Sequence, residues 1–418
     1  MHGLRGRIRR ALGVASGVAL LCSVPCLAQA EASGQVRLQW IGQQPASAGP
    51  LAQADVLQGG MVALPASGTT VETELRASGH GLTGVMTLQQ QRLESRATDS
   101  RAWVNELYAS HDGGAWQFSA GKKIVAWDVG YGFRPNDMVQ QEERRALVGS
   151  TAQGRALLLA EHFSASTAWS WVWVNPTRPA EQAGAQEPAL AARVYQRDGA
   201  VDWHGFARLG AHTGVSVGGA VAWVASDALE LHASLRFSER VDSKVIDPRV
   251  NGLVGTNPWK LAATPDVTQL LVGGTWTHAS QLSLLAEAWW DGTAAADAQW
   301  DAWAQRNAQL TTLATRGAPA AAVAGNLAWQ AEAFSVSPSL RRSNMFLRLS
   351  WQHEAWQPAL DLLYTPADQG RMVTASLTWQ GDRVQVQGGL RVYAGPADAV
   401  MLQLPARSMA YLASTWTF

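Results

Sequence analysis

Apolar and polar residues alternate along much of the chain, in runs of about eight to twelve positions. In 228–238, for example, Leu231 and Leu235 share one face, while Glu230 and Arg236 share the other. Successive side chains of a β-strand point to opposite faces, so a period of two predicts strands with one apolar and one polar face. The same pattern recurs at intervals up to the last residue.

Eighteen such runs are found, and each is a predicted strand. They begin near residues 34, 70, 81, 101, 115, 153, 166, 190, 201, 213, 228, 268, 280, 344, 355, 371, 382 and 408. Around 101–111 and 153–163 the alternation is blurred, and no faces are assigned there. Tight turns alternate with longer connections, the longest being expected over 42–69, 127–152, 175–189, 239–267, 291–343 and 394–407.

Short turns at one end and long loops at the other are typical of a barrel that crosses an outer membrane. The predicted fold is an all-β, transmembrane antiparallel β-barrel of about 18 strands, with short helical segments in the external loops. Sixteen strands is the alternative, with 34–41 as a plug or tail. A secreted sandwich or propeller would also give many short strands, but no blade repeat is found.

Tryptophan supports the barrel, because its ring suits the interface girdles at the two membrane surfaces. The chain has 20 Trp against 8 Phe and 6 Tyr. Those near the ends of predicted strands are Trp40, Trp116, Trp203, Trp223, Trp276, Trp290, Trp351, Trp356, Trp379 and Trp416.

The composition excludes several other classes of protein. With 33 Lys and Arg against 33 Asp and Glu, the chain has no surplus of positive charge for a nucleic acid. Hydrophobic residues make up 47%, which excludes intrinsic disorder. Beyond residue 22, no stretch approaches the ~18 apolar residues of a membrane-spanning helix.

Residues 1–30 have the form of a cleaved signal peptide. Four arginines precede an apolar stretch over 11–21, and 28–30 supplies the small-x-small cleavage site. Cleavage after Ala30 leaves 31–418 as the barrel, with 29 basic residues (33 − 4) against 33 acidic ones. Both cysteines lie in the removed segment, so no disulfide or thiolate metal site is expected in the mature protein.

The final predicted strand, 408–418, carries Leu412, Trp416 and the terminal Phe418 on one face. It resembles the C-terminal signature of Gram-negative outer-membrane β-barrel proteins, both porin-like and export-channel-like, which end in an aromatic residue that the barrel-assembly machinery recognises. The resemblance implies the cell outer membrane as the location. It implies outer-membrane lipid and that machinery as partners, and it allows a homotrimer.

The densest charge lies in 121–149, the third external loop by the alternation of connections. Within it, 138–148 is a predicted short helix that follows a capping box. In general porins the third loop folds into the barrel and constricts the pore, and this segment resembles it; a solvated external loop is the alternative. The residues predicted at the constriction are Lys122, Lys123, Asp128, Arg134, Asp137, Glu142, Glu143, Arg144 and Arg145.

If the apolar faces meet lipid, the polar faces line the lumen. Charges of both signs are found there, which argues against strong ion selectivity; each of these side chains could equally serve only to solvate the lumen. The charged and histidine residues on these faces are Glu72, Glu74, Arg76, Arg193, Arg197, Asp202, His204, Arg208, Glu230, His232, Arg236, Glu287, Arg348, Asp361, Arg383 and Arg391.

The predicted function is an outer-membrane channel that passes small solutes, or exports a polymer, through a loop-constricted polar lumen. Its solute would be a small molecule or a polysaccharide. A barrel enzyme of the lipase, deacylase or protease kind is one alternative, and a structural or adhesion barrel is another. No Gly-x-Ser-x-Gly elbow or zinc-binding histidine pair is found, so no catalytic residue, metal ligand or cofactor is predicted. The loop 291–343 contains a helical stretch with Trp300 and Trp303 on one face, suited to a lid, a plug or a partner surface.

Overall fold

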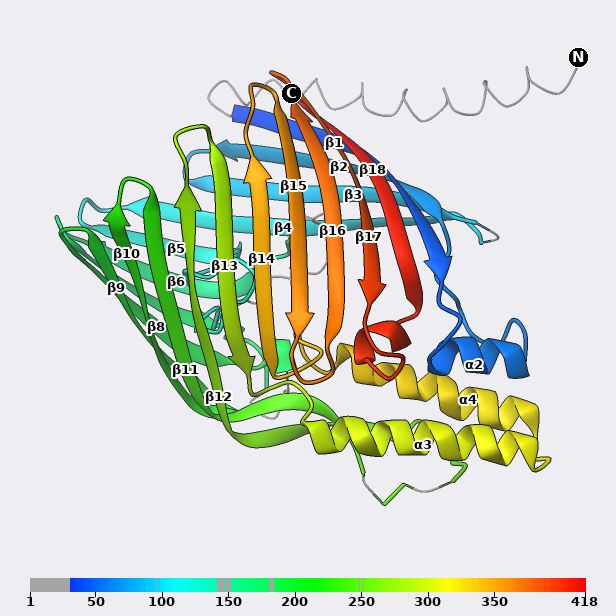
Figure 1. Ribbon diagram of the computed structural model, residues 1–418. Coiled ribbons are helices and arrows are strands. Elements are labelled where there is room, and N and C mark those ends of the chain that lie inside the picture. Colours follow the sequence, from blue (N-terminus) through cyan, green and yellow to red (C-terminus); the bar gives the residue numbers. More distant parts are fainter. Residues whose placement is uncertain are drawn as a thin grey trace, which may run out of the picture.

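The computed structural model describes residues 31–94, 96–140, 147, 152–179, 184–247, 249–250 and 252–418. Within them, eighteen antiparallel strands form one closed sheet, because β1 (Glu31–Pro45) pairs with both β2 (Gly68–Gly79) and β18 (Ala406–Thr417). The predicted barrel and its strand number are confirmed (Figure 1). The sixteen-strand alternative is wrong, since 34–41 lies within β1. The predicted signal peptide lies outside the described residues.

The other strands follow in chain order, and each is hydrogen-bonded to the next. They are β3 (Leu82–Leu93), β4 (Asp99–Asp112), β5 (Trp116–Lys123), β6 (Arg155–Phe163), β7 (Thr167–Val174), β8 (Ala189–Asp198), β9 (Val201–Gly210), β10 (Gly214–Ser226), β11 (Leu229–Ile246), β12 (Trp259–Thr277), β13 (Leu282–Asp291), β14 (Ser343–Trp351), β15 (Trp356–Thr365), β16 (Gly370–Gln380) and β17 (Val384–Ala394).

One predicted loop is largely a β-ribbon. Arg240 to Ile246 of β11 pair with Trp259 to Pro265 of β12, so much of 239–267 extends the hairpin beyond its neighbours in the wall. The sequence prediction missed this extension because 259–267 lacks a clean alternation of apolar and polar residues. Strand β12 therefore begins at residue 259 rather than near 268.

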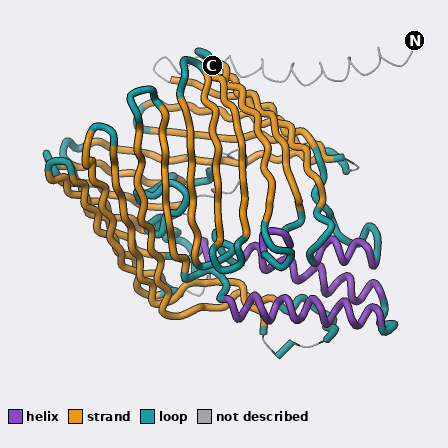
Figure 2. Tube along the Cα trace, viewed as in Figure 1, coloured by secondary structure: helices purple, strands orange, loops and turns teal. Residues whose placement is uncertain are grey.

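The two ends of the barrel differ. Every connection at one end, here called the turn end, has two to four residues. The other end, the loop end, carries all the longer connections and two short ones, 211–213 and 366–369. The helices gather at the loop end (Figure 2). They are α2 (Pro50–Leu57), α3 (Asp297–Thr315) and α4 (Ala320–Gln330), with the 3-10 turns η2 (Gly184–Gln186), η3 (Ala331–Ser335) and η4 (Val400–Gln403).

The three α-helices pack on one another at the loop end. Ala54 of α2, Leu310 of α3 and Leu327 of α4 share one buried apolar cluster. On α3 the predicted face is buried, with Trp300 and Trp303 packed edge to face. None of the helices in the described part of the chain is long and apolar enough to cross a membrane.

The predicted helix over 138–148 is not confirmed. Met138 to Gln140 have no helical structure, and apart from Leu147 the rest of that range lies outside the described residues. Instead of starting a helix, Asn136 and Asp137 use their side chains to hold the surrounding loop inside the barrel.

The outer wall of the barrel is apolar and the inner wall is largely polar. On β11, Leu235 is 50% exposed whereas its neighbour Ser234 is 2% exposed, and the same alternation continues through His232 and Arg236, which are buried. An exposed apolar face backed by a buried polar face is the reverse of a water-soluble sheet and is what a lipid-facing barrel requires.

Two local features explain where the alternation was blurred. In β6, Leu158 is exposed on the outer wall while Leu157 and Leu159 are buried on the inner wall, so both faces are apolar. In β4 a β-bulge opposite Val85 and Met86 adds one residue, and this shifts the phase of the strand.

The barrel closes where the chain ends. Gly34 of β1 and Phe418 exchange both backbone hydrogen bonds, each at 3.0 Å. The Phe418 ring lies on Gly34, where a Cβ atom would approach the ring to 2.6 Å. Leu412, Trp416 and Phe418 are exposed on the outer wall, as predicted.

Candidate functional site

The described residues of the connection between β5 and β6, which are 124–140, 147 and 152–154, lie inside the barrel and are called the inserted loop below. The β4 bulge holds both of its ends, because Asn105 and Glu106 both turn inward there. The Glu106 carboxylate accepts the Ile124 N–H at 2.9 Å, and Asn105 accepts the Gly154 N–H at 2.9 Å on its backbone carbonyl. The Asn105 amide also donates to the Ala152 carbonyl at 3.1 Å.

Polar side chains tie the inserted loop to the inner wall at β11. The Asp128 carboxylate accepts hydrogen bonds from the Ser234 hydroxyl at 2.8 Å and the Asn136 N–H at 2.6 Å. The Asn136 amide also donates to Ser234 at 2.8 Å, and Arg236 donates to the Pro135 carbonyl at 3.1 Å. These four hydrogen bonds fix the turn at 135–137 to the wall.

A second carboxylate organises the loop from within. Asp137 accepts the backbone N–H groups of Trp127 at 2.9 Å and Asp128 at 3.2 Å, and pairs with Arg134 at 2.9 Å. Burial raises the pKa of both Asp128 and Asp137, while their hydrogen bonds and Arg134 act in the opposite direction. Both acids are buried and stabilise the loop.

Glu287 of β13, two strands along the wall from β11, is a further anchor of the loop. Its two carboxylate oxygens accept the N–H groups of Tyr131 and Gly132, each at 2.7 Å. His232 contacts the same carboxylate at 3.0 Å, and its other ring nitrogen lies 3.1 Å from Glu230. The loop thereby bridges strands β11 and β13.

Aromatic side chains of the loop stack on aromatic side chains of the wall. There are three such stacked pairs, and the wall ring of each belongs to a different strand. Offset stacking of aromatic rings adds stability beyond that of apolar burial. The pairs are Trp127 with Phe206 of β9 at 6.4 Å, Tyr131 with Phe346 of β14 at 5.9 Å, and Phe133 with Trp289 of β13 at 5.6 Å.

The loop also fills one side of the lumen with apolar side chains. Val125, Trp127 and Met138 of the loop form a buried cluster with inward residues of β6 to β10, among them Leu157 and Phe206. This explains why β6 is apolar on both faces: one meets the membrane side and the other meets the loop. The inner wall is therefore apolar along β6 to β10, although the alternation in the sequence predicts polar side chains on the lumen face.

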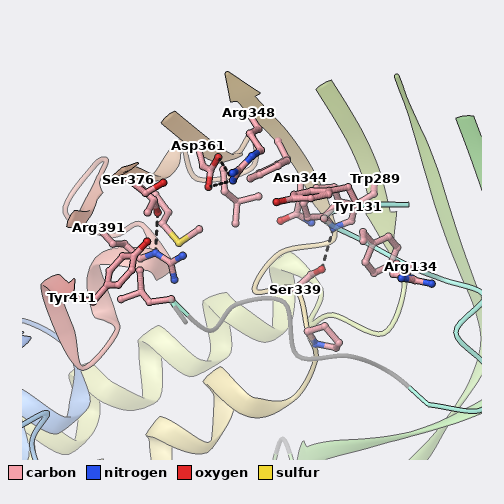
Figure 3. Close-up of a pocket in the computed structure, with 18 of the residues that line it drawn as sticks. Tyr131, Arg134, Trp289, Ser339, Asn344, Arg348, Asp361, Ser376, Arg391 and Tyr411 are labelled. Carbon is pink, nitrogen blue, oxygen red and sulfur yellow. Dashed lines mark hydrogen bonds and ion pairs between the residues drawn. The ribbon is translucent and has the colours of Figure 1, made fainter. Parts of the chain in front are cut away.

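On the opposite side, a cavity of about 350 Å³ lies between the inserted loop and β13 to β18, and is called the lumen pocket. Arg348 of β14 and Asp361 of β15, paired positions on one wall of this pocket, point toward each other with N–O distances of 2.9 and 3.0 Å (Figure 3). Arg391 and Tyr411 lie at one end, and Arg391 donates to Thr374 at 3.0 Å.

The other end of the lumen pocket is built by the loop and β13. Tyr131 and Arg134 of the loop lie there beside Trp289 and Asn344 (Figure 3). The Trp289 ring N–H donates to the Ser339 hydroxyl at 3.1 Å. The pocket thus has polar and charged groups along one wall and aromatic rings where the loop docks.

The predicted constriction residues separate into three groups. Asp128, Arg134 and Asp137 lie in the inserted loop inside the barrel, and Lys123 faces inward, where it donates to Ser119 at 3.1 Å. Lys122 was placed wrongly: it pairs opposite the exposed Leu107, on the outer wall, because adjacent residues of a strand face opposite sides. Glu142, Glu143, Arg144 and Arg145 lie outside the described residues.

Most predicted lumen residues face inward and engage one another. Their partners come from neighbouring strands and loops, and they form compact pairs away from the lumen pocket. The pairs are Glu72 with Arg37 at 3.4 Å, Arg193 with His204 at 3.2 Å, Asp202 with Tyr195 at 2.7 Å, and Arg208 with Glu187 at 2.8 Å.

Three predicted lumen residues lie elsewhere or stand apart. Arg383 is exposed in the turn before β17, so it lies at the turn end and not in the wall; the strand begins later than its alternation implied. Arg76 and Arg197 keep the inward phase of their strands but are exposed toward the turn end. In the described part of the chain, no group of three or more His, Cys, Asp or Glu could hold a metal ion.

Sequence prediction missed the groups that dock the loop, such as Ser234 and Phe206. Serine and phenylalanine carry no charge and gave no reason to be singled out. A usable signal was present in the loop, where Trp127, Tyr131 and Phe133 supply three large rings that need burial.

No family model matches the chain, and no curated protein sequence matches it. Solved structures do. OccAB3 of Acinetobacter baumannii is similar over 94% of this chain and 100% of its own, with a TM-score of 0.55 at 8% identity. OccAB1 of the same organism covers 94% and 97%, with a TM-score of 0.53 at 9% identity. A mutant of Rh. blastica porin covers 93% and 100%, with a TM-score of 0.43 at 10% identity. The resemblance to outer-membrane barrels is thereby confirmed for the fold.

Proposed function

We propose that the protein is an outer-membrane channel that passes small hydrophilic solutes through the lumen pocket. The observation that carries this proposal is the position of the inserted loop. Its apolar residues close the side of the lumen along β6 to β10, and the polar cavity remains along β13 to β18. A polar path inside a barrel with an apolar outer wall is what a membrane pore needs.

The dimensions of the lumen pocket favour small solutes over an exported polymer. A cavity of about 350 Å³ is at the lower end of sites that hold a single small molecule. Its charged side chains are three arginines and two aspartates in the described residues, Arg134, Arg348 and Arg391 with Asp137 and Asp361. This mixture supports weak selectivity with a slight preference for anions.

The test is single-channel recording of the purified full-length protein in planar bilayers. We expect stepwise ion conductance, and under a KCl gradient a reversal potential that indicates weak anion preference. Asp361→Asn removes one negative charge from the pocket and should increase that preference. Asp227→Asn, in an exposed turn outside the pocket, is the matched control and should leave it unchanged.

Folded protein that inserts but never conducts would refute the channel. The barrel enzyme and the adhesion barrel would then remain, and hydrolase activity or partner binding of the same preparation would separate them.

Export and insertion belong to the same proposal. We propose that 1–30 are removed after Ala30, so that the mature chain begins at Glu31, the first residue of β1. We also propose that the exposed Phe418 and Trp416 are read by the barrel-assembly machinery. N-terminal sequencing of the protein from the outer-membrane fraction tests the first point. Loss of membrane insertion after deletion of Phe418 tests the second.

A further inference from the structure

The outer wall has a different chemistry at each of its two ends. At the turn end it carries exposed tryptophans, which are Trp116, Trp169, Trp203, Trp223, Trp276, Trp351, Trp356 and Trp416. At the loop end it carries cations, together with the exposed Trp173 and Trp290. Arg92, Lys122 and Arg371 each lie one residue from the loop end of their strand and share the outward phase, and Arg342 directly precedes β14.

Two of these cations rest on aromatic rings of adjacent strands. The Arg342 guanidinium carbon lies 5.8 Å from the centroid of Trp290, an exposed residue of the outer wall. The Arg371 guanidinium carbon lies 5.9 Å from the centroid of Tyr364. Strands β13 to β16 thus carry the same arrangement twice, and the rings hold both guanidinium groups at the outer wall.

Both guanidinium groups keep donors available. Arg342 donates its Nε–H to the Ala294 carbonyl at 3.0 Å, which positions the group. Within the described residues, neither Arg342 nor Arg371 pairs with a carboxylate. Of the exposed carboxylates near the loop end, Glu239 lies on β11 and pairs with Arg240 at 3.2 Å. The two arginines therefore present positive charge that the protein itself does not neutralise.

The surface beneath the two arginines is apolar. Met345, Leu347, Leu360 and Leu377 are exposed on the same face, nearer the turn end. In a membrane these residues contact acyl chains, so the arginines lie at the level where lipid head groups begin. A guanidinium group binds the oxygens of a phosphate through paired hydrogen bonds.

We propose that Arg342 and Arg371 form a binding site for the anionic phosphate head group of a lipid in the leaflet at the loop end. The proposal rests on the membrane location given under the proposed function, but not on conduction through the lumen. The occupant is a lipid, because the site joins cationic donors to an exposed apolar surface below them. Positive charge at that level attracts an anionic head group by about 1 kcal/mol per arginine.

The experiment is native mass spectrometry of the full-length protein in detergent, with phosphatidylglycerol and phosphatidylcholine as probes. We expect the wild-type protein to retain phosphatidylglycerol preferentially. The double variant Arg342→Gln, Arg371→Gln should bind it on the order of 30-fold more weakly. The matched control is Arg316→Gln, an exposed arginine at the end of α3 away from the wall, and it should bind as the wild type does.

Equal retention by the wild-type protein and the double variant would overturn the proposal. So would an equal loss in Arg316→Gln, or complete displacement of the lipid by millimolar inorganic phosphate, which would mean a site for the free ion. Retained heat-dependent gel migration of each variant establishes that its barrel is folded. Single-channel recording of the double variant separates the two proposals, because the lumen pocket does not include either arginine.

Discussion

Replacing Trp127 with alanine should loosen the inserted loop without opening the barrel wall. Trp127 is 6% exposed and stacks on Phe206 of β9, in the same apolar cluster as Val125 and Leu157. No strand residue is changed, so the hydrogen-bonded wall stays complete.

The free-energy cost of Trp127→Ala can be estimated from the surface that the side chain buries. A tryptophan side chain that buries ~200 Å² contributes about 5 kcal/mol at ~25 cal/mol per Å². Truncations of this kind in packed cores cost about 3–5 kcal/mol. The contacts of Asp128 with Ser234 and of Glu287 with the loop amides remain, so the loop stays attached but samples displaced positions. A cost of about 3 kcal/mol already increases that sampling by more than about a hundredfold.

Single-channel recording provides the assay. The wild-type channel should show one steady conductance level, and Trp127→Ala should fluctuate between several levels because the loop borders the lumen pocket. The control is Trp223→Ala on the outer wall, where the side chain is 46% exposed, and its conductance should stay steady. A steady wild-type level in correctly folded Trp127→Ala would refute the view that apolar packing holds the loop in place.

Three further changes test the anchors of the loops. A Cβ at Gly218 would lie 1.9 Å from the Asn136 amide oxygen, whereas a Cβ at Gly219 would have its nearest atom 3.5 Å away. Amide hydrogen exchange in 131–140 should therefore rise in Gly218→Ala and stay unchanged in Gly219→Ala. Glu287→Gln weakens two charge-assisted hydrogen bonds and should destabilise the loop by about 2–3 kcal/mol, measured as faster proteolysis within it; unchanged proteolysis would contradict this anchor. The pKa of Asp368 lies below its usual 3.8, because hydrogen bonds to this carboxylate outweigh the effect of burial, which raises the pKa. Ionised Asp368 therefore stabilises the folded protein fully above pH 3.8, and this stabilisation is lost as the pH falls through the lower pKa of the folded protein. Amide hydrogen exchange in 395–405, corrected for intrinsic rates, should rise on acidification in the wild-type protein. It should depend less on pH in Asp368→Asn.

The strands were predictable because the outer wall imposes one requirement on nearly all of them. Every second residue faces the membrane side, so the period of two appears in the sequence whatever the lumen contains. Where another feature acts on a strand, its faces could not be assigned or part of the strand was missed. The bulge at Asn105 shifts β4, and the ribbon from Arg240 lies beyond the wall and is free of the membrane requirement.

The lumen was less predictable because its partners come from distant parts of the chain. Charge density in 121–149 drew attention to the correct loop, but the charges of Asp128 and Asp137 are used for anchoring. The position of the loop determines which charged residues border the lumen pocket. The rings of Trp127, Tyr131 and Phe133 fix that position by stacking on the wall. Stacking partners such as Phe206 and Phe346 are ordinary strand residues until the barrel brings them together.

The inserted loop and the inner wall are therefore parts of one core. Leu157, Leu159, Val172 and Phe206 face inward and are buried by the loop rather than by other strands. Deleting the whole loop would expose them to water in the lumen, at ~25 cal/mol for each Å² uncovered. Such a deletion should lower the stability of the barrel as well as change its conductance, and the two effects would be confounded. Point changes at single anchors leave the core covered, and for that reason they isolate what the loop does to the pore.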